Sequence, residues 1–230
     1  EFAGMTLNAA KTQIIGFGFT PEVQVLHGIS INPSSNFKFL GLTIEANLGV
    51  DMHVSHLCNK IRMAAARIRS EGSFLSTNDR RTLYQAWVNG VISSNGGAYL
   101  PLLNMSQTLD LQRACNQAIR AVVKLPRKSR DISITAIRSQ LNLPSIEQIT
   151  ERKCLMLAWR SRSNLRSLHE ETGPSTRARS KGNLPAPDQR GLRGKMIATS
   201  TRLAWNRLPI EIKEEETLAK AKSLIKQFTF

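Results

Sequence analysis

The sequence predicts an α+β protein, with a small antiparallel β-meander followed by a mainly α-helical region. Between residues 7 and 45, apolar residues alternate with polar ones, and glycine, proline and asparagine interrupt the runs, which is typical of short strands joined by turns. From about residue 50 the apolar residues recur every three or four positions, the period of an amphipathic helix. The 230 residues suffice to bury a sizeable core in one or two domains.

Three strand-like stretches make up the expected meander. The first is Thr12–Phe19, and the second is Val23–Ile31, in which His27-Gly28 is the expected turn. The third is Phe37–Glu45, in which we expect Phe37, Phe39 and Gly41 to face the same side.

Helices are expected over most of the remaining chain. In the first, apolar residues recur between Leu57 and Ile68, and Gly72 can end the helix. Ser76 with Asp79, and Ser145 with Gln148, have the spacing of N-terminal caps. Further helices are expected over residues 76–94, 106–124, 132–141, 146–168, 195–207 and 217–228. We expect three regions, 1–49, 50–130 and 131–230, the last with a flexible basic linker over 169–194.

The charge of the chain indicates a polyanionic partner. There are 32 Lys and Arg against 17 Asp and Glu, a formal net charge of +15. Residues 1–49 have a net charge of −1, and the regions 50–130 and 131–230 each have +8. The basic excess therefore belongs to the helices, where it favours contacts to phosphate groups. An anionic membrane or an acidic protein is a weaker alternative, and the helices carry too little apolar bulk opposite their charges to favour membrane insertion.

The cysteines and the lengths of the apolar runs indicate in which cellular compartment the protein is expected. Cys58, Cys115 and Cys154 lie far apart at apolar helical positions, which favours buried, reduced thiols in an intracellular protein. No apolar run reaches the length of about 18 residues that a membrane helix needs. His53 and His56 have no third ligand nearby in the sequence and make a poor metal site. We expect an intracellular protein, in the nucleus, the cytoplasm or both, with no membrane partner and no metal ion held by this chain.

Four motifs in this order resemble those of reverse transcriptases of non-LTR (LINE-like) retrotransposons. Leu7-Asn8-x-x-Lys11-Thr12 resembles the palm motif after the catalytic aspartates, and Phe37–Leu42 resembles the primer grip. His56-x-x-x-Lys60-Ile61 resembles the start of the thumb, and Trp205-Asn206-Arg207-Leu208-Pro209 resembles a C-terminal signature. The chain departs from the family in having Phe39 where tyrosine is usual, and in lacking a tryptophan shortly before His56.

The resemblance implies an architecture and an activity. Residues 1–49 would be the end of the palm with a primer-grip hairpin, 50–130 a helical thumb, and 131–230 a C-terminal helical extension. The intact enzyme would be an RNA-directed DNA polymerase, a nucleotidyltransferase that uses Mg²⁺ and dNTPs. The family's catalytic aspartates precede the motif that begins at Leu7, so we expect this chain to be inactive alone. Its partner would be an RNA template–DNA primer duplex or the RNA of the transposable element.

The resemblance also assigns roles to residues. Lys11 would protonate or stabilise the pyrophosphate leaving group in the intact enzyme; otherwise it is a surface lysine. Phe39, Leu40 and Gly41 would form the primer grip, in which a glycine allows close approach of the primer; otherwise they form an ordinary strand with a bend.

Phosphate ligands are expected on the helices and in the basic loops. Arg113, Gln117, Arg120 and Lys124 recur at helical spacing, and Lys60 and Arg67 do so on the first helix. Such faces can contact a nucleic-acid backbone, although many charged faces are only solvated. The candidate binding residues are Lys60, Arg67, Arg113, Arg120, Lys124, Arg127, Lys128, Arg177, Arg179 and Lys181. Two alternatives stay open: a domesticated or decayed RNA- or DNA-binding module without catalysis, and a helical protein-interaction domain whose charge serves solubility.

Overall fold

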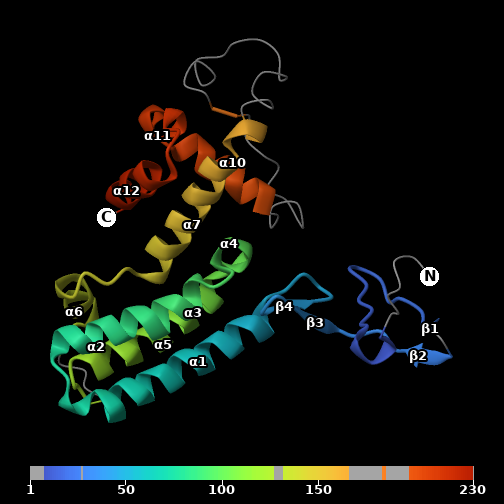
Figure 1. Ribbon diagram of the computed structural model, residues 1–230, viewed down its shortest axis with the longest axis horizontal. Helices are drawn as coiled ribbons and strands as arrows, with labels where there is room; N and C mark the ends of the chain where they lie inside the picture. The colour runs from blue at the N-terminus through green and yellow to red at the C-terminus, as the bar shows by residue number, and fades with distance from the viewer. Residues whose placement is uncertain (1–7, 27, 127–131, 166–182, 185–196, 230) are drawn as a thin grey trace. The chain divides into compact units, whose positions relative to one another are not determined.

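The computed structural model describes residues 8–26, 28–126, 132–165, 183–184 and 197–229. The chain divides into two compact units, residues 1–56 and 57–230. The first unit holds the strands and the second holds helices (Figure 1). The α+β class predicted from the sequence is therefore confirmed.

The strands of the first unit form two separate antiparallel hairpins. Strands β1 (Gln24–Leu26) and β2 (Ile29–Ile31) form the first hairpin. Strands β3 (Asn36–Phe39) and β4 (Leu42–Glu45) form the second, with Phe37 opposite Ile44 and Phe39 opposite Leu42. The first hairpin turns at the predicted position, where Gly28 has φ +76°.

Two details of the predicted meander are wrong. Thr12–Phe19 is not a strand, because among the described residues its pairing is limited to a single bridge between Ile14 and Pro33. Phe37–Glu45 is not one strand either, since the chain reverses at Leu40-Gly41. Both turn residues have positive φ, 47° for Leu40 and 87° for Gly41, as the two-residue turns that fit the twist of a hairpin require. Gly41 thus serves the turn and does not share a strand face with Phe39.

The second hairpin also fixes the start of the first helix, α1 (Asp51–Ser70). The carboxylate of Glu45 accepts a hydrogen bond from the Met52 amide, at 2.8 Å between Oε1 and N. The buried imidazole of His53 accepts one from the Thr43 amide, at 3.4 Å between Nδ1 and N. A carboxylate satisfies amide groups that the first helical turn leaves unpaired.

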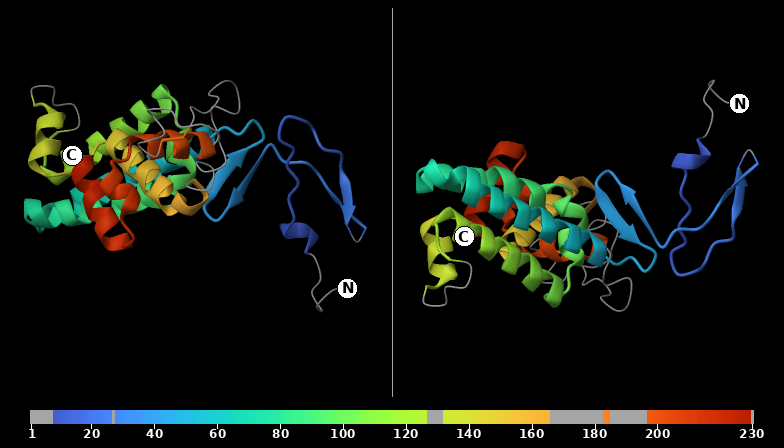
Figure 2. Two further views of the ribbon diagram at one scale, coloured as in Figure 1. Left: turned by 90° about the horizontal axis from the view of Figure 1, so that it is seen from above. Right: turned by 90° about the horizontal axis from the view of Figure 1, so that it is seen from below.

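The second unit begins with three helical segments that lie side by side (Figures 1 and 2). They are the C-terminal part of α1; the run of α2 (Thr77–Tyr84), the π-helical turn η3 (Gln85–Asn89) and α3 (Gly90–Ser93); and α5 (Met105–Val122). The 3-10 turns η2 (Glu71–Phe74) and η4 (Leu100–Leu102) and the short helix α4 (Gly96–Tyr99) lie between them. The predicted apolar stripe of α1 from Leu57 to Ile68 is buried.

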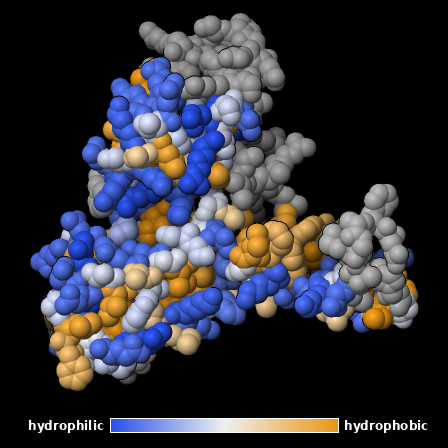
Figure 3. Space-filling model, viewed as in Figure 1, coloured by the Kyte–Doolittle hydropathy of each residue, from blue (hydrophilic) through white to orange (hydrophobic). Residues whose placement is uncertain are grey.

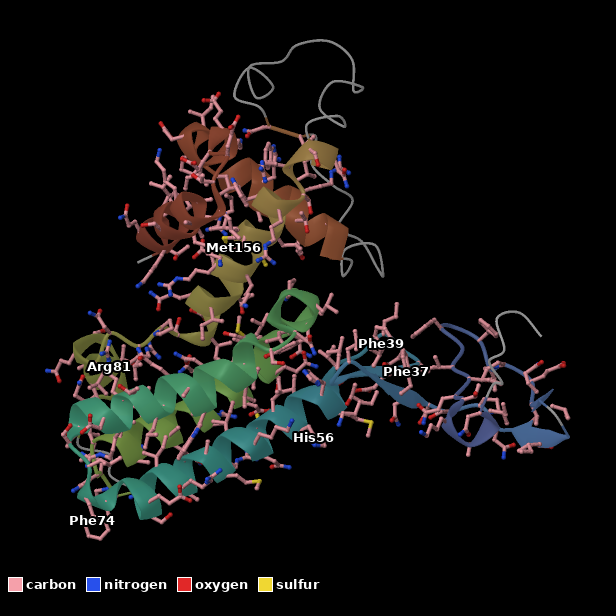
Figure 4. The ribbon with its side chains drawn as sticks, viewed as in Figure 1. Phe37, Phe39, His56, Phe74, Arg81 and Met156 are labelled. Atoms are coloured by element: carbon pink, nitrogen blue, oxygen red, sulfur yellow. The ribbon has the colours of Figure 1, made fainter. Side chains whose placement is uncertain are left out.

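The remaining helices form a second hydrophobic cluster around α7 (Ile146–Arg160). Helix α6 (Ile134–Gln140) precedes α7, and α10 (Ile197–Arg207) and α12 (Leu218–Phe228) pack on α7 (Figure 2). Trp159 and Trp205 are buried in this cluster, and Met156 packs against it from α7 (Figure 4). The short helix α11 (Ile210–Glu214) begins after Pro209 and precedes α12.

Helix caps confirm the sequence reading at two places and add a third. Ser145 and Gln148 form a reciprocal capping box at the start of α7. Ser76 Oγ accepts a hydrogen bond from the Asp79 amide at the start of α2. Asn104 and Gln107 form a capping box that starts α5 at Met105. This last cap follows the same spacing rule in the sequence.

Candidate nucleic-acid interface

The predicted basic stripe of α5 lies next to a second basic stripe on α1. A hollow of about 110 Å³ is lined by Arg62, Ala65, Ala66 and Arg69 of α1 and by Gln117 of α5. Gln117 is the middle of the stripe Arg113, Gln117 and Arg120, since residues four and three apart share one face of a helix. The two polar residues of α1 that line the hollow and the three residues of the α5 stripe together form what we call the α1–α5 face: Arg62, Arg69, Arg113, Gln117 and Arg120.

The environment of Cys58 supports this adjacency. Burial raises the pKa of the Cys58 thiol, while nearby Arg62 lowers it and Asp110 raises it. Arg62 of α1 and Asp110 of α5 therefore both lie close to the same thiol. Asp110 also pairs with Arg113, at 3.0 Å between Oδ1 and Nη1, with both side chains more than half exposed. Exposed pairs of this kind contribute at most about 1 kcal/mol, so a phosphate can compete for Arg113.

Lys60 and Arg67 belong to the other side of α1. They lie two positions from Arg62 and Arg69, which is about 200° around a helix. Arg67 pairs with Glu71 at 3.1 Å and lies over the ring of Trp87, with its guanidinium carbon 4.7 Å from the ring centroid. The structure therefore does not bring Lys60 and Arg67 together with the α5 stripe.

Lys124 departs from its expected position. Helix α5 ends at Val122, and Lys124 has φ +59°. Its Nζ donates a hydrogen bond to the Ser73 carbonyl at 2.8 Å. Lys124 thus connects the end of α5 to η2, whose Phe74 side chain is 96% exposed (Figure 4). Figure 3, in the same view, shows hydrophobic and hydrophilic side chains side by side on the surface of these helices.

Several cations that sequence reasoning did not single out hold the fold together. Arg80 is 4% exposed and donates to the carbonyl oxygens of Val122 and Leu75, both at 2.5 Å. Arg69 Nη1 donates to the Leu125 carbonyl at 3.1 Å. These bonds place positive charge at the C-terminal end of α5, where carbonyl groups lack helical partners and the helix dipole is negative. A sequence shows that both residues are basic, but it cannot show that Arg80 is buried or that Arg69 bonds to the Leu125 carbonyl.

The predicted primer-grip residues lie in the first unit. Phe39 is 58% exposed and Leu40 79% exposed. Phe37 and Phe39 lie on the same strand with ring centroids 6.4 Å apart (Figure 4). The tip of this hairpin therefore presents an apolar surface beside the Leu40-Gly41 turn.

Lys11 lies in a short 3-10 turn, η1 (Ala9–Lys11), and its side chain is exposed. The Asn8 carbonyl accepts from the Lys11 amide at 3.0 Å and from the Thr12 hydroxyl at 2.8 Å. Asn8 and Thr12 of the palm-like motif thus close one turn from which Lys11 projects.

The remaining predicted binding residues lie outside the described residues: Arg127, Lys128, Arg177, Arg179 and Lys181. Among the residues that the structure describes, no group of three or more His, Cys, Asp or Glu could hold a metal ion. Within the same residues, no helix has the length and apolar character needed to cross a membrane.

The three thiols have raised pKa values because they are shielded from water. Burial raises the pKa of Cys115 to about 12 and that of Cys154 to about 11. Thiolates are the reactive form of cysteine, so these side chains serve packing.

Comparison of the chain with protein-family models, with curated proteins and with solved structures finds no match.

Proposed function

We propose that this chain is the nucleic-acid-binding C-terminal part of a non-LTR retrotransposon reverse transcriptase, which grips the template–primer duplex. The observation that carries the proposal is the α1–α5 face, where four arginines from two helices lie beside one another. Arginine donates to phosphate oxygens in a planar fork, and such contacts position a duplex without reading its sequence. The four motifs in family order and the net charge of +15 support the same assignment.

The β3–β4 hairpin fits the second element of the proposal, the primer grip. Its exposed Phe39 and Leu40 offer an apolar shelf for a sugar or base. In the intact enzyme, Mg²⁺ and dNTPs would act at carboxylates upstream of the Leu7–Thr12 motif, and Lys11 would serve the leaving group.

The binding test uses a fluorescently labelled RNA–DNA hybrid duplex and anisotropy over a range of salt concentrations. The double variant R113Q/R120Q should weaken binding about tenfold or more and reduce the slope of log K against log salt by about 2, since two phosphate contacts are lost. The control R160Q/K222Q removes the same charge from two exposed residues outside the face. Equal weakening by both variants, or binding that ignores salt, would contradict the proposal; the second result favours a protein-interaction domain.

A separate assay addresses catalysis. We expect no primer extension by this chain on a primed RNA template with Mg²⁺ and dNTPs. DNA synthesis by the purified chain would refute the assignment of catalysis to residues upstream.

A further inference from the structure

A second cationic cluster surrounds a hollow in the helical unit and shares no residue with the α1–α5 face. The hollow has a volume of about 470 Å³, within the range of small-molecule sites, roughly 300–1,000 Å³. Its lining residues come from α2, η3, the turn between α6 and α7, α7 and α12. They are Arg81, Gln85, Asn89, Asn142, Pro144, Arg152 and Lys226.

Both arginines of the hollow are held in place by the protein. Arg81 Nε donates to the Leu141 carbonyl at 2.6 Å, and Figure 4 shows Arg81 on the side of its helix toward α6. Arg152 Nε donates to Thr229 Oγ1 at 2.7 Å, and the Thr229 hydroxyl donates onward to the Ile225 carbonyl. Anchoring through Nε orients each guanidinium before a ligand arrives, which lowers the entropy cost of binding.

The charges around the hollow are unbalanced. Arg81, Arg152 and Lys226 are cationic, and none of the described lining residues is acidic. Glu151 neighbours Arg152 in the sequence but pairs with Arg207 and lines a different hollow. Burial lowers the pKa of Arg152, because removal from water disfavours its charged form. An anion in the hollow would offset both the repulsion among the cations and this desolvation.

Three amide side chains complete the lining. Gln85 and Asn89 come from the two ends of the π-helical turn η3, and Asn142 lies in the turn after α6 with φ +52°. The buried Asn89 Oδ1 accepts no hydrogen bond from the described residues. An amide oxygen needs a hydrogen-bond donor, and a phosphate group offers mainly acceptors. The amides of the hollow therefore fit a ligand that carries donor groups as well as a phosphate. Asn and Gln are also the side chains that pair with the edge of adenine.

We propose that this hollow binds a phosphate group together with its attached nucleoside. The cations Arg81, Arg152 and Lys226 hold the phosphate, and the amides of Gln85, Asn89 and Asn142 bond to the base or the sugar. Two sources supply this chemistry: one nucleotide of a single strand, or a free nucleotide. The first source rests on the proposed nucleic-acid-binding function, and the second does not.

The test follows the ¹⁵N-labelled full chain by NMR during titration with adenosine 5′-monophosphate, with adenosine, and with a six-nucleotide single-stranded RNA. We expect the phosphorylated probe to shift the side-chain amide signals of Asn89 and Asn142 and the Nε–H signals of Arg81 and Arg152. Adenosine should bind at least about tenfold more weakly, since it lacks charge-assisted bonds. Shifts by the RNA alone identify a strand nucleotide as the ligand, and shifts by the mononucleotide identify a free one.

A matched pair of variants separates the pocket from bulk charge. Lys226 and Lys222 are both exposed on α12, and only Lys226 lines the hollow. K226Q should weaken the binding of whichever phosphorylated probe binds more tightly by about tenfold, and K222Q should leave this affinity unchanged. No shift with either phosphorylated probe, equal binding of adenosine, or equal effects of the two variants would overturn the proposal.

The proposal for the hollow and the proposal for the α1–α5 face can be refuted independently of each other. R113Q/R120Q should lose affinity for the hybrid duplex and keep the pocket signals, while K226Q should keep the duplex affinity. If K226Q weakens duplex binding and R113Q/R120Q does not, the hollow binds the duplex, and the proposal of a separate nucleotide pocket is refuted.

Discussion

Replacing Arg80 by methionine should destabilise the helical unit more than any change of an exposed cation. The Arg80 side chain is 4% exposed and makes two short bonds to main-chain carbonyls, those of Val122 and Leu75. Its weaker bonds go to the Gly72 carbonyl at 3.4 Å and to Thr77 Oγ1 at 3.0 Å. Methionine fills similar volume and supplies none of these donors.

The magnitude follows from the two short bonds. A buried carbonyl left without a donor costs about 1–3 kcal/mol, so two cost about 2–6 kcal/mol. The Leu75 carbonyl is only partly buried, and removal of the guanidinium also removes the cost of burying its charge. We therefore expect a loss of about 3 kcal/mol in the free energy of unfolding. With a denaturant slope of about 2 kcal/mol/M in urea, the midpoint should fall by about 1.5 M.

Tryptophan fluorescence during urea unfolding measures this effect selectively, because Trp87, Trp159 and Trp205 all lie in residues 57–230. R80K keeps a charge and one or two donors and should lose about half as much. The control R113M removes a side chain that is 73% exposed and should change stability by less than about 0.5 kcal/mol. A loss below about 1 kcal/mol for R80M, or a similar loss for R113M, would refute the reasoning.

Three further predictions follow from individual contacts. L40N should slow hydrogen exchange of the β3–β4 amides about fivefold, because asparagine tolerates the positive φ of this turn better than leucine by about 1 kcal/mol; unchanged or faster exchange would contradict this. N206A should cost about 2 kcal/mol in urea unfolding, because Asn206 Oδ1 accepts from the Leu184 amide at 2.7 Å and Asn206 Nδ2 donates to the Leu184 carbonyl at 2.8 Å. N206D should cost at least as much, because it sets a carboxylate oxygen against the Leu184 carbonyl oxygen. The free energy of unfolding should fall between pH 9 and 12, with Cys115 contributing up to about 1.4 kcal/mol per pH unit, because it keeps its proton in the folded state up to a pKa of about 12 and releases it at an ordinary pKa when unfolded. C115A should make the fall shallower by this contribution, while the raised pKa values of Cys154 and Tyr84 preserve the rest.

Local signals were sufficient to predict much of the helical unit. The stripe from Leu57 to Ile68 depends only on spacing within one segment, and so does the capping box of Ser145 and Gln148. The turn at Leu40-Gly41 was missed because leucine is rarely found at positive φ, so the sequence lacks the asparagine or aspartate that normally marks such a turn.

The sites depend on contacts between distant segments, which a single sequence does not display. The α1–α5 face joins residues about 50 positions apart, and it selects Arg62 and Arg69 where spacing alone had favoured Lys60 and Arg67. The hollow joins Arg81 to Lys226. Each of its cations looks like an ordinary surface residue until the packing of α7 on α12 brings them together.

The residues of the Trp-Asn-x-Leu-Pro motif stabilise the C-terminal cluster. Trp205 and Leu208 are buried in the C-terminal cluster, Asn206 bonds to the main chain of Leu184, and Pro209 precedes α11. Packing and hydrogen bonding therefore account for these residues without any ligand, so the motif says little about chemistry. The same reasoning sets aside Arg80, because its side chain is buried and its donors bond to main-chain carbonyls and to Thr77 Oγ1. Among the residues that the structure describes, the α1–α5 face and the hollow are two places where cations gather without a matching number of acids, and binding experiments should begin there.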